Sequence, residues 1–402
     1  MNKDQSTLEP TKSRIAEGRA LFPGAERWIY MDVSLRGLIS TKVRAAVENY
    51  LDERVNNGGD KAWMLDTIER TRGLYARLIN ADPIEIAYTK NVSEALNMVA
   101  GAMTWAKGDN VVVCPNIEHP NNVYLWYNLQ KRLGVEVRAV TPDDGRVPVE
   151  DMIGAINDRT RLVTVPTVSF SPGFITDVNS LAEVCRSRGV FLLVDAAQSV
   201  GVLHTDVREL DVDALTVATQ KGLLAFYGMG FLYCRREWAD RLWPASLARF
   251  GVDLGSAHET ALGGGDLRLQ PGARRFDLGN YNYLAAVAAE ASFGMLLDLD
   301  TREIEAYVRG LSRRLSAGLH ELDLPVCGGP PGDHTSHIVT VGELGGGHDT
   351  TSDAEMSRLY DHLTDNGVKL SVRRGVLRFS LHFYNNEEDV DRVIELARKW
   401  KK

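Results

Sequence analysis

Short apolar segments rich in β-branched residues alternate with longer amphipathic segments from about residue 84 onward. The apolar segments are IEIAYT, NVVVCP, VEVRAV, RLVTVPTVSF, VFLLVD, ALTVAT and GFLYC. This alternation predicts an α/β fold in which helices wrap a mostly parallel sheet. Segments such as VFLLVD, apolar at nearly every position, are typical of strands covered on both faces. Ligands are then expected at the C-terminal ends of the strands.

Three parts are predicted along the chain: an N-terminal segment over 1–30, a large domain over 31–282 and a smaller domain over 283–402. A Gly- and Arg-rich stretch over about 245–280 precedes a long helical pattern, YLAAVAAEASFGMLLDL. Beyond it, the strands HIVTVGEL, VKLSVRRG and VLRFSLHF and two helical segments predict a small α+β domain.

Composition narrows the class of partner and the compartment. The 46 Lys and Arg residues against 54 Asp and Glu residues give a net charge of −8, which argues against nucleic acid. The four cysteines are far apart with no CxxC spacing, which indicates a reducing compartment rather than a disulfide framework. The sequence has neither a signal peptide nor a membrane span, so we predict a cytoplasmic protein without membrane contact.

Two charged residues stand at predicted strand ends. Asp195 ends VFLLVD, where a carboxylate either caps the next turn or faces a protonated ligand nitrogen or a metal. Lys221 follows the strand ALTVAT; it is either a solvated loop lysine or a desolvated amine able to form a Schiff base. The two would face one pocket if their strands are neighbours.

Three further positions have a functional and a structural interpretation. Asn91 and Glu94 are spaced like a capping box, and the amides that follow Asn91 at this helix start are also suited to hold a phosphate. His119 follows the strand NVVVCP without a second histidine at metal-ligand spacing, which favours stacking or acid–base work over zinc, and no metal site is predicted. Arg378, in VLRFSLHFYN, forms either an internal salt bridge or a clamp for a substrate carboxylate.

Several motifs occur together in a fixed order: EH, SFSPGFITD, VDAAQ, QKGLLAFYGMGFLY, FDLGNYN and LRFSLHFYN. With them the chain resembles the class V branch of the fold-type I pyridoxal-phosphate (PLP) enzymes, which includes cysteine desulfurases, selenocysteine lyases and isopenicillin N epimerase-like proteins. The resemblance covers nearly the whole chain. It implies a mostly parallel seven-stranded sheet, a smaller C-terminal α+β domain, PLP as cofactor and a homodimer with shared active sites.

The resemblance also implies roles for individual residues. Lys221 would bind the cofactor as a Schiff base and move the proton at the substrate α-carbon. Asp195 would pair with the pyridinium nitrogen, as expected from the preference of a buried carboxylate for a protonated partner. His119 would stack on the ring, and Gln198 would hydrogen-bond near the phenolic oxygen.

Matching positions assign the remaining groups. Val92 and Ser93 would bind the phosphate through their amides, and Asn280 would reach the phosphate of the partner subunit's cofactor. Arg378 would grip the substrate carboxylate.

The sequence departs from the family pattern near the cofactor. Gln220 replaces the histidine that often precedes the lysine, Ala218 replaces a serine, and Phe170 replaces an asparagine near the phenolic oxygen. We therefore expect Thr219 to contribute to the phosphate site.

The nucleophilic cysteine of desulfurases, expected shortly before the carboxylate-binding arginine, is absent from VKLSVRRGVLR. We therefore predict a carbon–sulfur lyase that eliminates thiol from an S-substituted cysteine in secondary metabolism, such as antibiotic biosynthesis, and not a persulfide-forming desulfurase. Alternatives are decarboxylation-coupled oxidative deamination, transamination, epimerisation and a non-catalytic PLP-fold binding protein. Arg36, Arg373 and Tyr227 are the candidate specificity residues beside Arg378.

Overall fold

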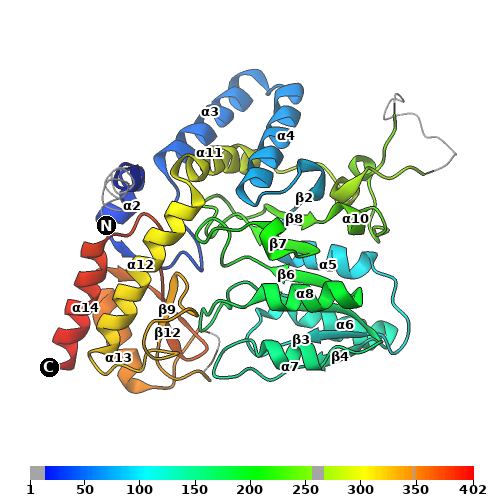
Figure 1. Cartoon of the computed structure of the whole chain (residues 1–402). Coiled ribbons are helices and arrows are strands. Elements are labelled where there is room, and N and C mark those ends of the chain that lie inside the picture. Colours follow the sequence, from blue (N-terminus) through cyan, green and yellow to red (C-terminus); the bar gives the residue numbers. More distant parts are fainter. Residues whose placement is uncertain (1–13, 256–266, 346, 348) are drawn as a thin grey trace, which may run out of the picture.

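The computed structural model describes residues 14–255, 267–345, 347 and 349–402, and its main element is a sheet of seven strands (Figure 1). The strand order is β2-β8-β7-β6-β5-β3-β4. These strands are β2 (Ile86–Thr89), β3 (Asn110–Val113), β4 (Glu136–Ala139), β5 (Thr160–Pro166), β6 (Phe191–Asp195), β7 (Ala214–Ala218) and β8 (Gly230–Cys234). Strand β8 is antiparallel to both its neighbours, and the other six share one direction. The predicted α/β fold with a mostly parallel seven-stranded sheet is confirmed.

Helices cover both faces of this sheet, which explains why its strands are apolar throughout. In β3, Val111 and Val113 pack into one core and Val112 packs into the other. The first core holds α5 (Val92–Ala102) and α6 (Tyr124–Leu133), and the second holds α7 (Val149–Gly154) and α8 (Val178–Arg188). Strands buried on both sides place their C-terminal ends in one row, where the polar residues of the loops gather.

Three long helices form a separate layer at one end of the sheet (Figure 1). They are α3 (Thr41–Asn57), α4 (Lys61–Leu78) and α11 (Tyr283–Leu299), and α11 packs against the other two. The shorter helices of this part of the chain are α2 (Pro23–Arg27), α9 (Val207–Leu210), α10 (Arg236–Ala239), η1 (Pro83–Glu85), η2 (Pro120–Asn122), η3 (Arg249–Gly251) and η4 (Gly272–Phe276).

The C-terminal part is the expected small α+β unit. Its antiparallel sheet has the order β11-β12-β9. Its elements are α12 (Thr301–His320), β9 (Ile338–Val341), α13 (Ala354–Asp365), β11 (Ser371–Arg373), β12 (Val376–Ser380) and α14 (Glu387–Lys401). The predicted domain boundary at 282/283 coincides with the start of α11 and remains a prediction.

The N-terminal segment joins this small unit rather than the large sheet. Strand β1 (Ile29–Tyr30) pairs in parallel with β10 (Val368–Lys369), and the backbone N–H of Ser34 donates to Ser380 Oγ at 2.9 Å. The first 13 residues of the predicted 1–30 segment lie outside the described residues. Among the helices that the structure describes, none is both long and apolar enough to cross a membrane.

Candidate active site

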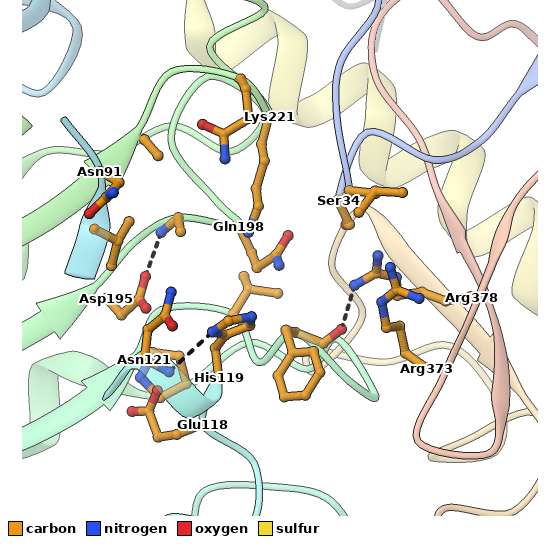
Figure 2. Close-up of a pocket in the computed structure, with 18 of the residues that line it drawn as sticks. Ser34, Asn91, Glu118, His119, Asn121, Asp195, Gln198, Lys221, Arg373 and Arg378 are labelled. Carbon is orange, nitrogen blue, oxygen red and sulfur yellow. Dashed lines mark hydrogen bonds between the residues drawn. The ribbon is translucent and has the colours of Figure 1, made fainter. Parts of the chain in front are cut away.

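Asp195 and Lys221 meet because their strands are neighbours. Strand β6 pairs with β7, so that Asp195 lies opposite Thr216, and Lys221 follows shortly after β7 ends. Both side chains line one cavity of about 240 Å³ at the C-terminal ends of these strands (Figure 2). The sequence predicted one shared pocket for Asp195 and Lys221 if their strands are neighbours, and the strands β6 and β7 are neighbours.

Burial sets the protonation of this pair. Desolvation raises the pKa of Asp195, while the N–H of Ala197, which donates to Asp195 Oδ1 at 2.9 Å, and the charge of Lys221 lower it. Desolvation lowers the pKa of Lys221 to about 8, with Asp195 acting against the shift and Arg378 and Arg373 adding to it. A lysine with this pKa is still mostly protonated at pH 7, but its neutral, nucleophilic fraction is far larger than that of an ordinary lysine.

Two glycines allow the loops that carry these residues to touch. A Cβ on Gly222 would lie 2.5 Å from the carbonyl oxygen of Val200, and one on Gly201 would lie 2.3 Å from the carbonyl oxygen of Gly222. Side chains at either position would separate the loop after β6 from the loop after β7. The spacing of Asp195 and Lys221 thus depends on glycine at positions 201 and 222, because glycine has no side chain.

The N-terminus of α5 opens toward the same cavity. Asn91 caps the helix by accepting a hydrogen bond from the N–H of Glu94 at 2.9 Å, whereas the Glu94 carboxylate accepts from Lys90 and not from Asn91. The capping interpretation is therefore correct for one half of the predicted box. Val92 lines the cavity and Ser93 does not, although its amide belongs to the same first turn.

His119 and Phe170 form one wall. Their rings meet edge to face, with centroids 5.5 Å apart and planes at 73°. His119 Nδ1 accepts a hydrogen bond from the N–H of Asn121 at 3.2 Å, which fixes the orientation of the imidazole and leaves the proton on Nε2. A flat ring bound in the cavity would therefore lie beside this imidazole.

Arg378 reaches the cavity from the small unit. It is almost fully buried in β12, where its NH1 donates to the Phe170 carbonyl at 2.9 Å and its Nε donates to Ser371 Oγ at 3.2 Å. Burial lowers its pKa to about 10, which still leaves it cationic at neutral pH. The nearest carboxylate is Asp32, whose Oδ1 lies 3.8 Å from NH2. The internal ion pair is thus loose, and the guanidinium can accept a second anion.

The other predicted site residues divide into two groups. Gln198, Phe170, Tyr227 and Arg373 line the cavity.

Three residues lie elsewhere: the contacts predicted for Arg36 and Thr219 need correction, whereas the contact of Asn280 with a partner subunit stays a prediction. Arg36 is exposed and does not line the cavity, because the chain turns away after Leu35. Thr219 is buried and its hydroxyl donates to the Phe226 carbonyl at 2.6 Å, so it stabilises its own loop. Asn280 borders a different cavity, with Thr89 and Gly228, on the outside of the chain.

Sequence reasoning missed several residues of the cavity wall. Glu118, Asn91, Asn121 and Ser34 all line it. Glu118 was visible in the EH motif, but only the histidine was given a role. Ser34 arrives through the pairing of the N-terminal segment with the small unit, which no local pattern indicates.

PLP needs an amine for its aldehyde, a carboxylate for its ring nitrogen, a partner for its ring face and donors for its phosphate. Lys221, Asp195, His119 and the first turn of α5 supply these groups around one cavity. The buried Oε1 of Gln198 has no hydrogen-bond partner among the residues that the structure describes, as expected of a group that contacts a ligand. The residues present therefore fit PLP.

No cysteine lines the described wall of this cavity. Cys114, Cys185 and Cys234 are buried in or beside sheet and helix elements, and Cys327 is partly buried. Burial raises the pKa of all four thiols, to about 12 for Cys114 and Cys185. All four are therefore protonated at neutral pH, the less nucleophilic form of the group.

Comparison with known proteins gives relatives along almost the full chain. A probable cysteine desulfurase of Methanothermobacter thermautotrophicus is 30% identical, over 94% of this chain and 96% of the relative. An uncharacterised aminotransferase of Bacillus subtilis is 29% identical, over 95% of this chain and 97% of the relative. The solved structure of an apo cysteine desulfurase from Thermococcus onnurineus has a TM-score of 0.81 at 25% identity and covers 95% of this chain and 96% of its own.

These names overturn the reaction predicted from the sequence. The relative from Methanothermobacter thermautotrophicus and the solved structure from Thermococcus onnurineus are named cysteine desulfurases, not lyases of S-substituted cysteines in secondary metabolism, so that prediction was wrong. The same names weigh against the exclusion of desulfurase chemistry that was drawn from the missing loop cysteine. An absent residue in one loop identifies neither a substrate nor a pathway.

The family itself is established by a match along most of the chain. The model of the family described as Aminotransferase class-V matches residues 30–393, a range that contains every residue of the cavity wall. The chain therefore belongs to the class V aminotransferase family of PLP-dependent enzymes.

Proposed function

We propose that this protein removes the α-proton of an α-amino acid and transfers its amino group to a 2-oxo acid. The observation that carries the proposal is one cavity lined by Lys221, Asp195 and Arg378 and by no described cysteine. The family description and the aminotransferase name of the Bacillus subtilis relative support the same reaction class.

Bound PLP supplies an electron sink for the carbanion that deprotonation of the α-carbon leaves. Asp195 favours the protonated form of a ring nitrogen placed against its carboxylate, because a buried anion is best stabilised by a nearby cation. His119 limits the tilt of a ring beside it. The amides at the start of α5, at the positive end of the helix dipole, suit a phosphate.

The chain's own groups then orient the amino acid. Arg378 binds the α-carboxylate with its guanidinium, since its internal ion pair with Asp32 is loose. The Lys221 Nζ, with its pKa lowered to about 8, accepts the α-proton as a general base near its optimal pKa.

A second candidate is desulfuration of cysteine, which the names of the relatives favour. In this chain the sulfur would have to pass to a small thiol from solution, because the four cysteines lie outside the cavity wall and are protonated. That reaction uses the same Lys221 and Arg378 for its first steps. The two candidates differ in the bond that breaks: transamination removes the amino group from the α-carbon, whereas desulfuration breaks the Cβ–S bond and leaves the amino group on alanine.

One incubation separates the candidates. The PLP-loaded protein is given single L-amino acids, including alanine, aspartate and cysteine, with a 2-oxo acid, and products are measured by chromatography with a sulfide assay. We expect a new amino acid formed from the 2-oxo acid, and its loss in Lys221→Ala. Alanine and sulfide formed from cysteine in the presence of an added thiol, without amino transfer from any donor, would contradict the proposal and support desulfuration.

We also propose a homodimer in the cytoplasm. Asn280 lies exposed on the outer side of the chain, as a residue that reaches a partner's site would need to be. Sedimentation at micromolar concentration tests the assembly: a single species of 44.5 kDa, the mass of one chain, contradicts it.

A further inference from the structure

Arg373 places a second guanidinium in the cavity beside Arg378. The two residues come from the two strands of one hairpin, β11 and β12, and Figure 2 shows their side chains next to each other. The side chain of Arg373 is only 13% exposed, so this is not a solvated surface arginine. One arginine is enough for the α-carboxylate, and the second is available for another group.

The cavity continues past Arg373 into a second one of about 540 Å³. Leu35 and Arg373 line both, so the guanidinium stands at the point where they adjoin. Its wall also holds the carboxylate residues Asp32, Asp349 and Asp361 and the hydroxyl residues Ser357 and Tyr360, so Arg373 is the cation of this described wall. A substrate held by Arg378 therefore has space for an acid group beside Arg373, where the two cavities adjoin, while the carboxylates disfavour an anion deeper in the second cavity.

In the free protein an aspartate accepts from Arg373. Asp349 forms an ion pair with Arg373 NH1, and its own side chain is 65% exposed. An ion pair with one solvated partner contributes little to stability, so its exchange for another carboxylate costs little. Arg373 keeps its position on β11 during such an exchange, while Asp349 moves into water.

We propose that Arg373 binds the distal acid group of an amino acid substrate that has two acid groups, and that Asp349 occupies this position until the substrate arrives. The substrate class is an α-amino acid with a carboxylate, or an acid of similar shape, on a short side chain. The inference rests on the proposed function, because it takes the α-carboxylate to be on Arg378 and the α-carbon at Lys221.

Two measurements test the proposal, and the first involves no chemistry. Calorimetry gives the dissociation constants of succinate and propionate, which carry two and one carboxylates and no amine. We expect succinate to bind more tightly than propionate, and Arg373→Gln to weaken succinate by about 10- to 100-fold, the range for a hydrogen bond between charged groups. Arg358→Gln, at an exposed arginine of α13 outside both cavity walls, is the matched control and should change neither constant.

The second measurement compares kcat/KM for aspartate and alanine as amino donors. Arg373→Gln should lower the ratio of aspartate to alanine by about 10- to 100-fold, and Asp349→Asn should raise it, because it removes the competing anion. Equal binding of succinate and propionate, or an unchanged ratio in Arg373→Gln, would overturn the inference. Selective succinate binding without amino transfer from either donor would instead refute the proposed reaction and leave the subsite standing.

Discussion

Glu118 is a buried carboxyl group in the cavity wall, and the neighbour that acts against its pKa shift is the Asn122 side chain. It is 4% exposed, and neither of its oxygens has a hydrogen-bond partner in the described chain. Desolvation, and then the nearby charge of Asp195, raise its pKa well above the ordinary value. Because Asp195 accepts the N–H of Ala197, the negative charge is better stabilised on Asp195, and the raised pKa favours the protonated form of Glu118.

We predict that Glu118→Gln makes the cofactor-free protein more stable than wild type, and that this difference grows as the pH rises. A carboxyl with a raised pKa in the folded state stabilises the fold only at low pH, and this contribution is lost above the pKa of the unfolded chain. An amide does not titrate, so the variant should gain about 1 to 3 kcal/mol over wild type at pH 8 and little at pH 4. Denaturant unfolding at both pH values measures the difference.

The matched control is Glu183→Gln, at an exposed glutamate of α8. Its stability relative to wild type should vary far less with pH. The opposite result is that Glu118→Gln loses stability relative to wild type between pH 4 and pH 8. That result would mean that Glu118 is ionised in the fold.

The sequence predicted those site residues that stand at strand ends. Asp195 and Lys221 follow from the rule that polar groups after parallel strands share one edge. Arg36 and Thr219 did not follow it, because both lie in loops whose path depends on tertiary contacts. Glu118 stands in the EH motif, but its role could not be predicted, because a buried carboxyl looks in a sequence like any charged loop residue.

At the scale of elements, burial on both faces made the large sheet predictable. All seven apolar segments became strands, although the segment over 161–170 leaves the sheet after Pro166. From there the chain turns, and the Ser169 N–H bonds to the Phe174 carbonyl. The pairing of β1 with β10 was not predictable, because it joins residues more than 300 positions apart through only two residues on each strand.

The contact between the two loops gives a prediction for Gly222. In Gly222→Ala the new Cβ would meet the Val200 carbonyl at 2.5 Å, so the loop with Lys221 must move away from Asp195. We expect a loss of about 1 to 3 kcal/mol in unfolding free energy, together with weaker PLP binding in a fluorescence titration. Only the change in PLP binding reports on the site.

Gly294→Ala serves as the control within a helix. Gly294 lies inside α11 with no atom near its would-be Cβ, so alanine should stabilise by up to about 1 kcal/mol and leave PLP affinity unchanged. If Gly222→Ala binds PLP as tightly as Gly294→Ala does, the loop contact does not set the spacing of the site.

Across the whole molecule, the cavity is built by three parts of the chain that meet in one place. The large sheet supplies Lys221 and Asp195, the small unit supplies Arg378 and Arg373, and the N-terminal segment supplies Ser34. The groups suited to PLP come mainly from the large sheet, and those suited to the substrate acid come from the hairpin β11–β12. The net charge of −8 therefore says little about the substrate, because cations are concentrated locally.

The central claim is that Lys221 is the amine that holds PLP, and chemical trapping tests it most directly. The PLP-loaded protein is reduced with borohydride, digested and mapped by mass spectrometry. We predict that the added cofactor mass is found on the peptide with Lys221 and that Lys221→Ala carries no such adduct. An adduct on another lysine, such as Lys90, or an equal yield of adduct in Lys221→Ala, would contradict the account.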